Sequence, residues 1–334
     1  IYMKAPSRNY SDAGYATFKT SGAPATRKAV VFVSSQDGFM HAINAHTGAV
    51  TMGGATVQPG EELWAYLPTQ AMQNIKVLAD INYPSNHRFF VDGPIAVADV
   101  NFNPPENEPD WHTIVVGGHG AGGTAYFALD VTDPLNPAFL WEFTNANLGY
   151  TFSNPVLSKL PNGQWAVLFA SGYNNNTGGG DGVGRLYAID PKTGAIKSGF
   201  PMSTASGSVG TPSNLGKIAV WVDNAANNNT AKFVYAGDTK GDLWRFDFDP
   251  SATGHSGAAV FKLAHLTDPG GVGRPITTKP ELTTVLTPSS NLVHQVLVGT
   301  GQYLEEADLT NTDIQSFYAI KDTLGADNLG NGIQ

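Results

Sequence analysis

The sequence contains no cysteine in its 334 residues. It therefore has no disulfide framework, thiolate zinc site, iron–sulfur cluster or cysteine nucleophile. Charged residues are also scarce, at 14% of the chain, and they sum to a formal net charge of -9. An acidic chain without a cluster of lysine and arginine lacks the basic surface that nucleic acids require. No apolar run reaches the roughly 18 residues of a membrane-spanning helix, so we expect neither a nucleic-acid partner nor a membrane span.

Helical periodicity is nearly absent, and short apolar runs bounded by Gly, Asn, Asp and Pro take its place. Such runs are typical of β-strands joined by tight turns. The chain also has 38 glycines and ample aromatic residues, with 6 Trp, 12 Tyr and 17 Phe. These features predict an all-β protein with a sizeable core.

One pair of strands recurs along the chain. An apolar strand leads into a turn of small residues, and a second strand of aromatic–Ala–apolar–Asp character follows it. The first strands of the five copies begin at Val30, Ile114, Val167, Phe233 and Val296. The second strands are Phe39–Asn44, Tyr126–Asp130, Leu186–Asp190, Leu243–Asp247 and Phe317–Ile320. A third strand with Pro near its start precedes the later copies, at Pro94, Pro155, Pro212 and Pro275.

The repeat is about 60 residues long and predicts four strands, which is the unit of a β-propeller blade. A four-stranded sheet cannot bury both faces alone, whereas stacking around an axis buries them against neighbouring sheets. The fifth copy lies near the C-terminus with no clear copy after it. The prediction is therefore a β-propeller of four-stranded blades that is five-bladed, modified or incomplete, with an unrelated β-sandwich as the alternative.

Five segments in a fixed order carry a more specific resemblance. They are VVFVSSQDGFMHAINAHTG, GEELWAYLP, DGPIAVADV, WHTIVVGGHGAGGTAYFALDVTDP and FVYAGDTKGDLWRFDF. Together they resemble the C-terminal β-propeller region of the PilY/PilC family, which are type IV pilus biogenesis proteins and tip-associated adhesins of Gram-negative bacteria. The resemblance runs from about Val30 to Ile320.

The resemblance implies that residues 1–334 form a single β-propeller domain from the C-terminal region of a larger protein. It implies a non-enzymatic role in pilus biogenesis, twitching motility and attachment to host or other surfaces. The implied partners are pilins or minor pilins and a host-cell or surface receptor. The implied location is extracellular, at the cell surface, the pilus tip or the outer membrane.

The family resemblance also implies a calcium loop before the YAGD strand, and the corresponding stretch here is 223–232. Asp223 supplies a carboxylate, and Asn227 and Asn229 could add amide oxygens. Calcium takes six to eight oxygen ligands, and its affinity grows with the number of carboxylates. Ala225 stands at a ligand position of the family, and Ala231 or Lys232 replaces the closing acid. We therefore predict calcium binding that is weak or absent, with an Asn-rich hairpin loop as the alternative interpretation.

Two other functions remain as alternatives. A quinoprotein-type dehydrogenase would need a quinone, a calcium ion and an acidic base, and many such enzymes carry a vicinal Cys pair that this chain lacks. No quinone is expected here, because the chain has no Cys and its one candidate calcium loop precedes a strand rather than forming part of a central cluster. No catalytic residue is expected either, because the eight His show no clustered spacing and no nucleophile elbow is present. The second alternative is a generic propeller that binds protein or glycan.

The recurring Asp residues have a simpler interpretation than catalysis. Asp130, Asp190 and Asp247 end equivalent strands, where carboxylates usually accept backbone N–H groups of the following turn. Propellers bind partners through the loops at their faces. The longest predicted loops are Asn101–Asp110, Asn174–Asp181, Pro250–Gly257 and Tyr303–Gln315, and we predict that a subset of them contacts a pilin or a host receptor.

Overall fold

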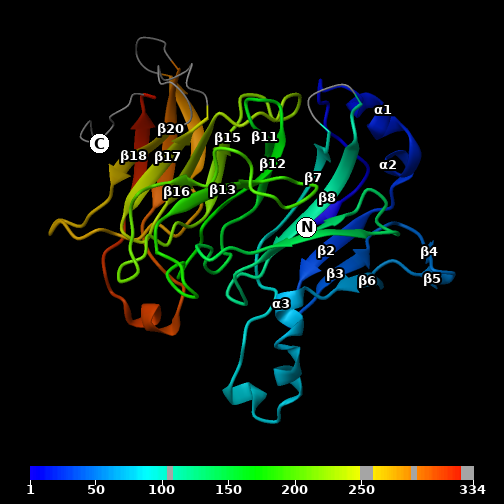
Figure 1. Ribbon diagram of the computed structural model, residues 1–334, viewed down its shortest axis with the longest axis horizontal. Helices are drawn as coiled ribbons and strands as arrows, with labels where there is room; N and C mark the ends of the chain where they lie inside the picture. The colour runs from blue at the N-terminus through cyan, green and yellow to red at the C-terminus, as the bar shows by residue number, and fades with distance from the viewer. Residues whose placement is uncertain (104–107, 249–258, 287–291, 325–334) are drawn as a thin grey trace.

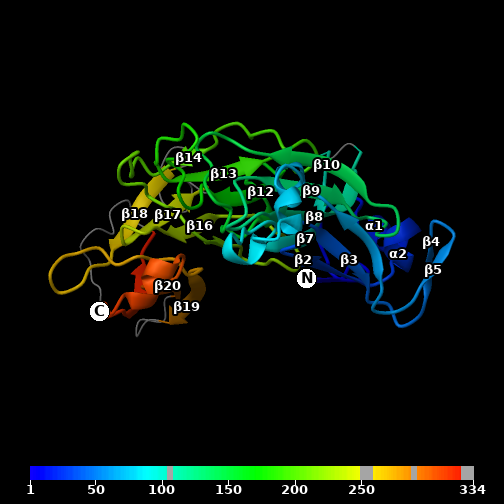
Figure 2. The same cartoon turned by 90° about the horizontal axis from the view of Figure 1, so that it is seen from below.

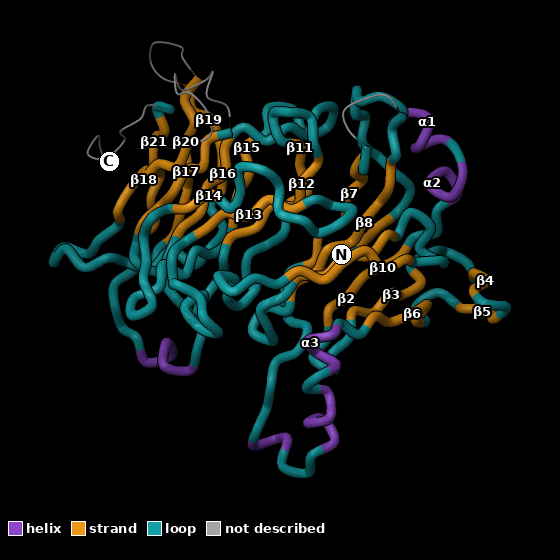
Figure 3. The backbone as a smooth tube through the Cα atoms, viewed as in Figure 1, coloured by secondary structure: helices purple, strands orange, loops and turns teal. Residues whose placement is uncertain are grey.

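The structure is a computed structural model that describes residues 1–103, 108–248, 259–286 and 292–324. Its secondary structure is almost entirely β, as predicted (Figure 3). Antiparallel pairing joins neighbouring strands along the chain, so each sheet is a local meander. Four sheets have four strands each, and the fifth has three strands among the described residues.

Within each of the five sheets, the strands follow chain order from one edge to the other. The first sheet contains β1 (Tyr2–Met3), β2 (Val30–Ser34), β3 (Met40–Asn44) and β6 (Glu62–Tyr66). The second contains β7 (Ile95–Asn101), β8 (Trp111–Gly118), β9 (Tyr126–Asp130) and β10 (Ala138–Phe143). The third contains β11 (Val156–Lys159), β12 (Trp165–Ala170), β13 (Arg185–Ile189) and β14 (Met202–Ser203). The fourth contains β15 (Ile218–Trp221), β16 (Phe233–Gly237), β17 (Asp242–Asp247) and β18 (Ala259–His265). The fifth contains β19 (Glu281–Leu286), β20 (Leu292–Gly299) and β21 (Phe317–Asp322).

Short elements decorate these sheets. A separate hairpin pairs β4 (Val50–Met52) with β5 (Ala55–Val57). Two short helices, α1 (Tyr15–Thr20) and α2 (Gly22–Thr26), precede β2. The helix α3 (Thr69–Met72) and the 3-10 turns η1 (Ile75–Ala79) and η2 (Tyr83–Ser85) lie in one projection, and η3 (Glu306–Thr310) lies between β20 and β21.

The five sheets follow one another along an arc, with the first and last sheets at its two ends (Figures 1 and 2). Adjacent sheets meet through strands near the start of each sheet: β7 lies beside both β2 and β11, and β15 lies beside β19. This arrangement confirms the predicted propeller architecture in its modified or incomplete form. Strands in the middle of the arc are buried on both faces, and all six residues of β12 are buried. In β21, by contrast, exposed and covered residues alternate.

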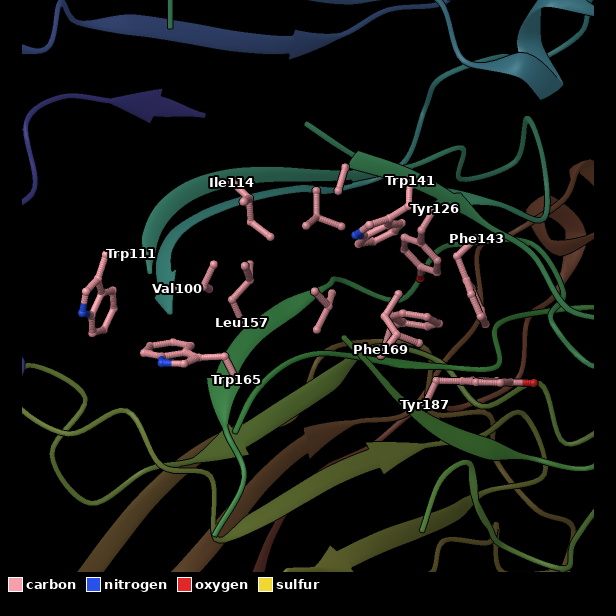
Figure 4. Close-up of a cluster of buried hydrophobic side chains, with 14 of the residues drawn as sticks. Val100, Trp111, Ile114, Tyr126, Trp141, Phe143, Leu157, Trp165, Phe169 and Tyr187 are labelled. Carbon is pink, nitrogen blue, oxygen red and sulfur yellow. The ribbon is translucent and has the colours of Figure 1, made fainter. Parts of the chain in front are cut away.

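Aromatic and aliphatic side chains fill the spaces between adjacent sheets. Figure 4 shows the cluster between the second and third sheets. Trp111 meets Trp165 edge to face at 5.7 Å, and the rings of Tyr126 and Phe169 lie 4.2 Å apart. Burial of such large side chains stabilises each inter-sheet contact by several kcal/mol, of the order of 1.5–3 kcal/mol per side chain.

Tryptophans on the fourth strand lock each of the first two sheets to the next one. The Trp64 indole N–H donates to the Pro134 carbonyl at 2.8 Å, and the Trp141 indole N–H donates to the Pro191 carbonyl at 3.0 Å. Both acceptors belong to the turn that ends the recurring strand pair of the next sheet. Gly194 in that turn has φ of 71°, and a Cβ there would lie 2.9 Å from Trp141. The turn after β13 therefore packs against the Trp141 indole of the preceding sheet. This close contact and the positive φ explain the glycine at position 194.

Some finer expectations differ from the structure. Pro94 and Pro155 immediately precede β7 and β11, but Pro212 and Pro275 lie well before β15 and β19 and belong to no strand. Five residues separate Pro212 from β15 and five separate Pro275 from β19, so neither proline starts its strand. Trp244 lies on the third strand of its sheet and donates to Asp238 of the same sheet, unlike the two bridging tryptophans.

Candidate functional site

The stretch 223–232, predicted as the calcium loop, connects β15 to β16. Asp223 lies at its start, and its carboxylate is already engaged. Lys232 Nζ lies 2.6 Å from Oδ2, and the Trp221 indole N–H donates to Oδ1 at 3.0 Å. The hydrogen bond from Lys232 lowers the pKa of Asp223. The loop therefore contains both the carboxylate of Asp223 and the Lys232 ammonium group that neutralises it.

The two asparagines of the predicted site contact other parts of the molecule. The carbonyl of Asn227 accepts the backbone N–H of Ser11 at 2.9 Å. The carbonyl of Asn229 accepts the N–H of Lys159 at 2.7 Å, and its side-chain amide donates to the Leu157 carbonyl at 2.9 Å. The loop therefore joins the fourth sheet to β11 and to the N-terminal segment.

These contacts test whether the loop fits calcium. The single carboxylate is paired with the Lys232 ammonium group. The backbone carbonyls of Asn227 and Asn229 already accept backbone N–H groups from other segments. No hydrogen bond links Asp223 to Asn227 or Asn229 within the described ranges, where no cluster of three or more acidic or histidine side chains has metal-binding geometry. The residues present do not match the oxygen-rich shell that calcium requires. Weak or absent binding stays our prediction for this loop.

The turn-capping interpretation of the recurring aspartates is confirmed at two positions. Asp130 Oδ1 accepts the N–H of Thr132 at 2.9 Å. Asp190 Oδ1 accepts the N–H groups of Lys192 and Thr193, each at 3.0 Å. These carboxylates hold the turns that receive the bridging tryptophans.

Two histidines each lie between a pair of carboxylates. His41 contacts Glu62 through Nδ1 and Asp37 through Nε2. His112 contacts Asp130 at 2.5 Å through Nδ1 and Asp110 at 2.9 Å through Nε2, and Phe102 stacks on its ring at 4.3 Å. Burial alone would lower the pKa of each histidine, but hydrogen bonds to the carboxylates outweigh it and raise the pKa. The arrangement favours a charged imidazolium and suits a structural role.

The predicted contact loops differ in what the structure places in them. Pro250–Gly257 lies outside the described residues, as do positions 104–107 of the Asn101–Asp110 loop. The Tyr303–Gln315 loop carries η3 and three exposed apolar side chains, with Tyr303 74%, Leu309 64% and Ile314 84% exposed. An exposed apolar group of this kind is a common feature of protein contact surfaces.

The projection formed by residues 69–89 has no counterpart among the predicted loops. The helix α3 and the turns η1 and η2 extend away from the arc (Figures 1 and 3). Ile81, between η1 and η2, is 93% exposed, and Met72 and Phe89 are also exposed. Its short helical pieces carry no strong 3.6-residue periodicity, which is the signal that would reveal them in a sequence.

A cavity lies at the turns between second and third strands, and the sequence patterns do not predict it. It has a volume of about 330 Å³, and three of its lining residues are the aromatic residues Tyr150, Phe152 and Tyr173. These residues come from the connector between the second and third sheets and from the turn after β12. Only the unusual density of aromatics in the short segments 150–152 and 173 could mark the place.

Three comparisons relate the chain to known proteins. The sequence profile of the PilY1 beta-propeller domain matches residues 2–330. The type IV pilus biogenesis factor PilY1 of Pseudomonas aeruginosa strain UCBPP-PA14 is 32% identical over 329 residues, covering 88% of this chain. A PilY1 homologue of Xylella fastidiosa is 31% identical over 330 residues, covering 96% of this chain. The crystal structure of the Pseudomonas aeruginosa PilY1 C-terminal domain superposes with a TM-score of 0.70 at 31% identity, over 92% of this chain.

The matched proteins are longer than this chain. It spans about a quarter of the two relatives, with 25% of the first and 24% of the second covered. It covers 60% of the solved C-terminal domain. In the part of the chain that the structure describes, no helix combines the length and apolar character needed to cross a membrane.

Proposed function

This chain belongs to the family of PilY1 beta-propeller domains, and from that premise we propose that it is the propeller of a type IV pilus biogenesis factor. The match over residues 2–330 is the observation that carries the proposal. In this role the propeller acts by binding, at the pilus or the cell surface, and supports pilus assembly, twitching motility and attachment. The relatives are named as biogenesis factors, which favours a non-enzymatic role.

We further propose that pilins or minor pilins are the partners, with a host-cell or surface receptor as a second partner. The Tyr303–Gln315 loop supports this because its apolar side chains are exposed between β20 and β21 of the fifth sheet. The projection of residues 69–89 offers a second exposed apolar surface.

The binding role is tested with the full-length protein in its own bacterium. Replacing Tyr303, Leu309 and Ile314 by serine is expected to reduce twitching and pilin capture, because their apolar surface is lost without changing the core. A matched control replaces the exposed Val209 and Val272, which lie on other loops. Twitching and capture at the level of the unaltered protein would contradict the assignment of this loop.

A separate assay addresses enzymatic activity. The protein is mixed with a quinone, calcium and a dye acceptor, and dye reduction is followed over a panel of alcohols and sugars. We expect no turnover above the protein-free rate. Dye reduction that depends on the protein would favour the quinoprotein alternative instead.

A further inference from the structure

The cavity at the turn face is built from several successive sheets. In four of them, the residue two or three positions beyond the second strand lines it. These residues are Ala121 after β8, Tyr173 after β12, Thr239 after β16 and Gln302 after β20. The cavity therefore lies where equivalent turns of four sheets converge, which is the usual place of a propeller binding site. Its volume of about 330 Å³ is within the range of small-molecule sites.

Tyr173 is the most informative residue of the cavity. It is only 4% exposed, and its hydroxyl makes none of the hydrogen bonds found among the described residues. The hydroxyl is not one of the fully buried unpaired polar atoms among the described residues, so it opens to the cavity that Tyr173 lines, where a ligand can reach it. A Cβ at Gly216 would lie 2.7 Å from this hydroxyl, so the glycine leaves the room that it occupies. Burial raises the pKa of Tyr173, and the group stays a neutral donor and acceptor.

The backbone around the cavity is held in an uncommon conformation. Asn174 and Asn214 both line it and have φ of 57° and 54°. The side-chain oxygen of Asn214 accepts the N–H of Asn174 at 2.8 Å, and its amide donates to Thr239 at 3.1 Å. Two left-handed asparagines fixed to each other and to the next sheet indicate a preorganised site. The backbone at Asn174 is therefore held in place, and its side chain lines the cavity from a fixed position.

The remaining lining groups define the ligand chemistry. Phe152 and Tyr173 meet edge to face at 5.3 Å, and Tyr150 is 37% exposed beside them. No Lys, Arg or His is among the described residues that line the cavity, which disfavours phosphate, sulfate and nucleotides. The one carboxylate, Glu305, accepts an N–H within the capping box of η3, so it is committed to its own turn rather than to a cation. The groups available to bind a ligand are therefore aromatic faces and neutral hydrogen-bond donors and acceptors.

We propose that this cavity binds a neutral saccharide of one or two sugar units. The apolar C–H face of a sugar ring packs on the aromatic rings. Its hydroxyls need partners that donate and accept, and the Tyr173 hydroxyl and the Asn174 carboxamide do both. Gln302, on the turn after β20, adds a further acceptor oxygen, since its amide nitrogen donates to Asp308 at 2.9 Å. This inference does not depend on the pilus role.

Binding is tested on the 334-residue protein by saturation-transfer NMR and titration calorimetry. The probes are glucose, galactose, mannose, N-acetylglucosamine and their neutral disaccharides, with choline and sodium phosphate as charged probes. We expect at least one neutral sugar to bind with a dissociation constant of the order of 1 mM. Neither charged probe is expected to bind at the cavity.

Substitutions of cavity residues test whether the sugar binds in this cavity. Tyr173→Phe removes only the hydroxyl and should weaken binding about fivefold. Tyr150→Ala removes the open aromatic face and should weaken it about tenfold. Asn174→Gly removes the carboxamide and keeps the left-handed backbone, so it remains informative if Tyr173→Phe folds poorly. Tyr2→Ala is the matched control, because Tyr2 is exposed on β1 and does not line the cavity.

Three results would overturn the proposal. One is the absence of binding for every neutral sugar at concentrations of about 10 mM. Another is binding of choline or phosphate alone. The third is sugar binding that Tyr150→Ala and Asn174→Gly leave unchanged, which would place the sugar elsewhere on the protein.

Discussion

The ammonium group of Lys232 lies 2.6 Å from Oδ2 of Asp223, where a bound cation would otherwise neutralise the carboxylate. Asp223 is the only acidic residue of the loop, and the loop backbone contacts β11 and the N-terminal segment directly. A lysine side chain and backbone hydrogen bonds thus hold this loop in place.

Calcium is expected to bind the protein with a dissociation constant of about 1 mM or weaker, as for sites of low charge. Lys232→Asp removes the competing cation and adds a carboxylate, and we expect calcium affinity to rise by about tenfold or more. Lys217→Asp is the control, since Lys217 is exposed outside the loop. Titration calorimetry measures both. A micromolar site in the unaltered protein would contradict this account of the loop; Asp223→Ala should abolish any binding at this loop.

Trp141→Ala is expected to destabilise the protein by about 3–5 kcal/mol, because the indole fills the contact between the second and third sheets. Trp141→Phe keeps an aromatic ring but leaves the Pro191 carbonyl without its donor, for about 1 kcal/mol. Phe139→Ala, on the same strand but exposed, should change stability by less than about 1 kcal/mol. Urea unfolding measures these differences. Equal effects of Trp141→Ala and Phe139→Ala would contradict the bridging role.

The buried ion pair between Arg245 and Asp322 joins the fourth sheet to the fifth. Both side chains are fully buried, their charged atoms lie 2.5 Å apart, and the Tyr235 hydroxyl donates to Asp322 at 2.8 Å. Asp322→Asn should cost about 3–5 kcal/mol, since it breaks a buried ion pair. Asp313→Asn breaks a half-exposed pair with Arg274 and should cost less than about 1 kcal/mol. If hydrogen exchange in β19–β21 is the same in both variants, the pair does not anchor the fifth sheet.

Stability should decrease as the pH rises above the unfolded pKa of histidine. The folded pKa of His112 is raised above its ordinary value of 6.5, so the charged form stabilises the folded state. This contribution is complete below pH 6.5 and is lost as the pH rises through the raised pKa. Asp110, Asp130 and Lys192, which pairs with Asp110, are the charged groups around the ring.

The matching measurement is the free energy of unfolding at about pH 6 and about pH 9. His112→Gln should lose less stability over this interval than the unaltered protein, whereas His46→Gln should not, because His46 forms none of the ion pairs found among the described residues. An identical pH dependence in His112→Gln and the unaltered protein would contradict the charge assignment.

Local patterns predict the strand pairs well. The aromatic–Ala–apolar–Asp pattern predicts Tyr126–Asp130 with the bounds that β9 has, because it ends in a carboxylate-capped turn. The same patterns predict neither the two-residue strand β14 nor the helical projection of residues 69–89. The first is too short to show alternation, and the second has no sustained periodicity.

The candidate sites are likewise predictable from the sequence only where the signal is local. The weakness of the Asp223 loop is visible in its composition, because charge count is a sequence property. The Lys159 and Ser11 contacts of that loop are not visible there, since they join segments far apart in the chain. The cavity at Tyr173 takes its walls from four sheets, so only the folded arrangement brings its groups together.

The central claim is that this propeller serves type IV pilus biogenesis, and a count of surface pili tests it most directly. Residues 1–334 are removed in frame from the gene in its own bacterium, and pili per cell are counted by electron microscopy with and without a complementing copy of the complete gene. We predict a marked loss of surface pili that the complete gene restores, and that a complementing gene carrying Trp141→Ala restores less fully than one carrying Phe139→Ala. Normal pilus numbers in the deletion strain, with the shortened protein present at its usual level, would contradict the account.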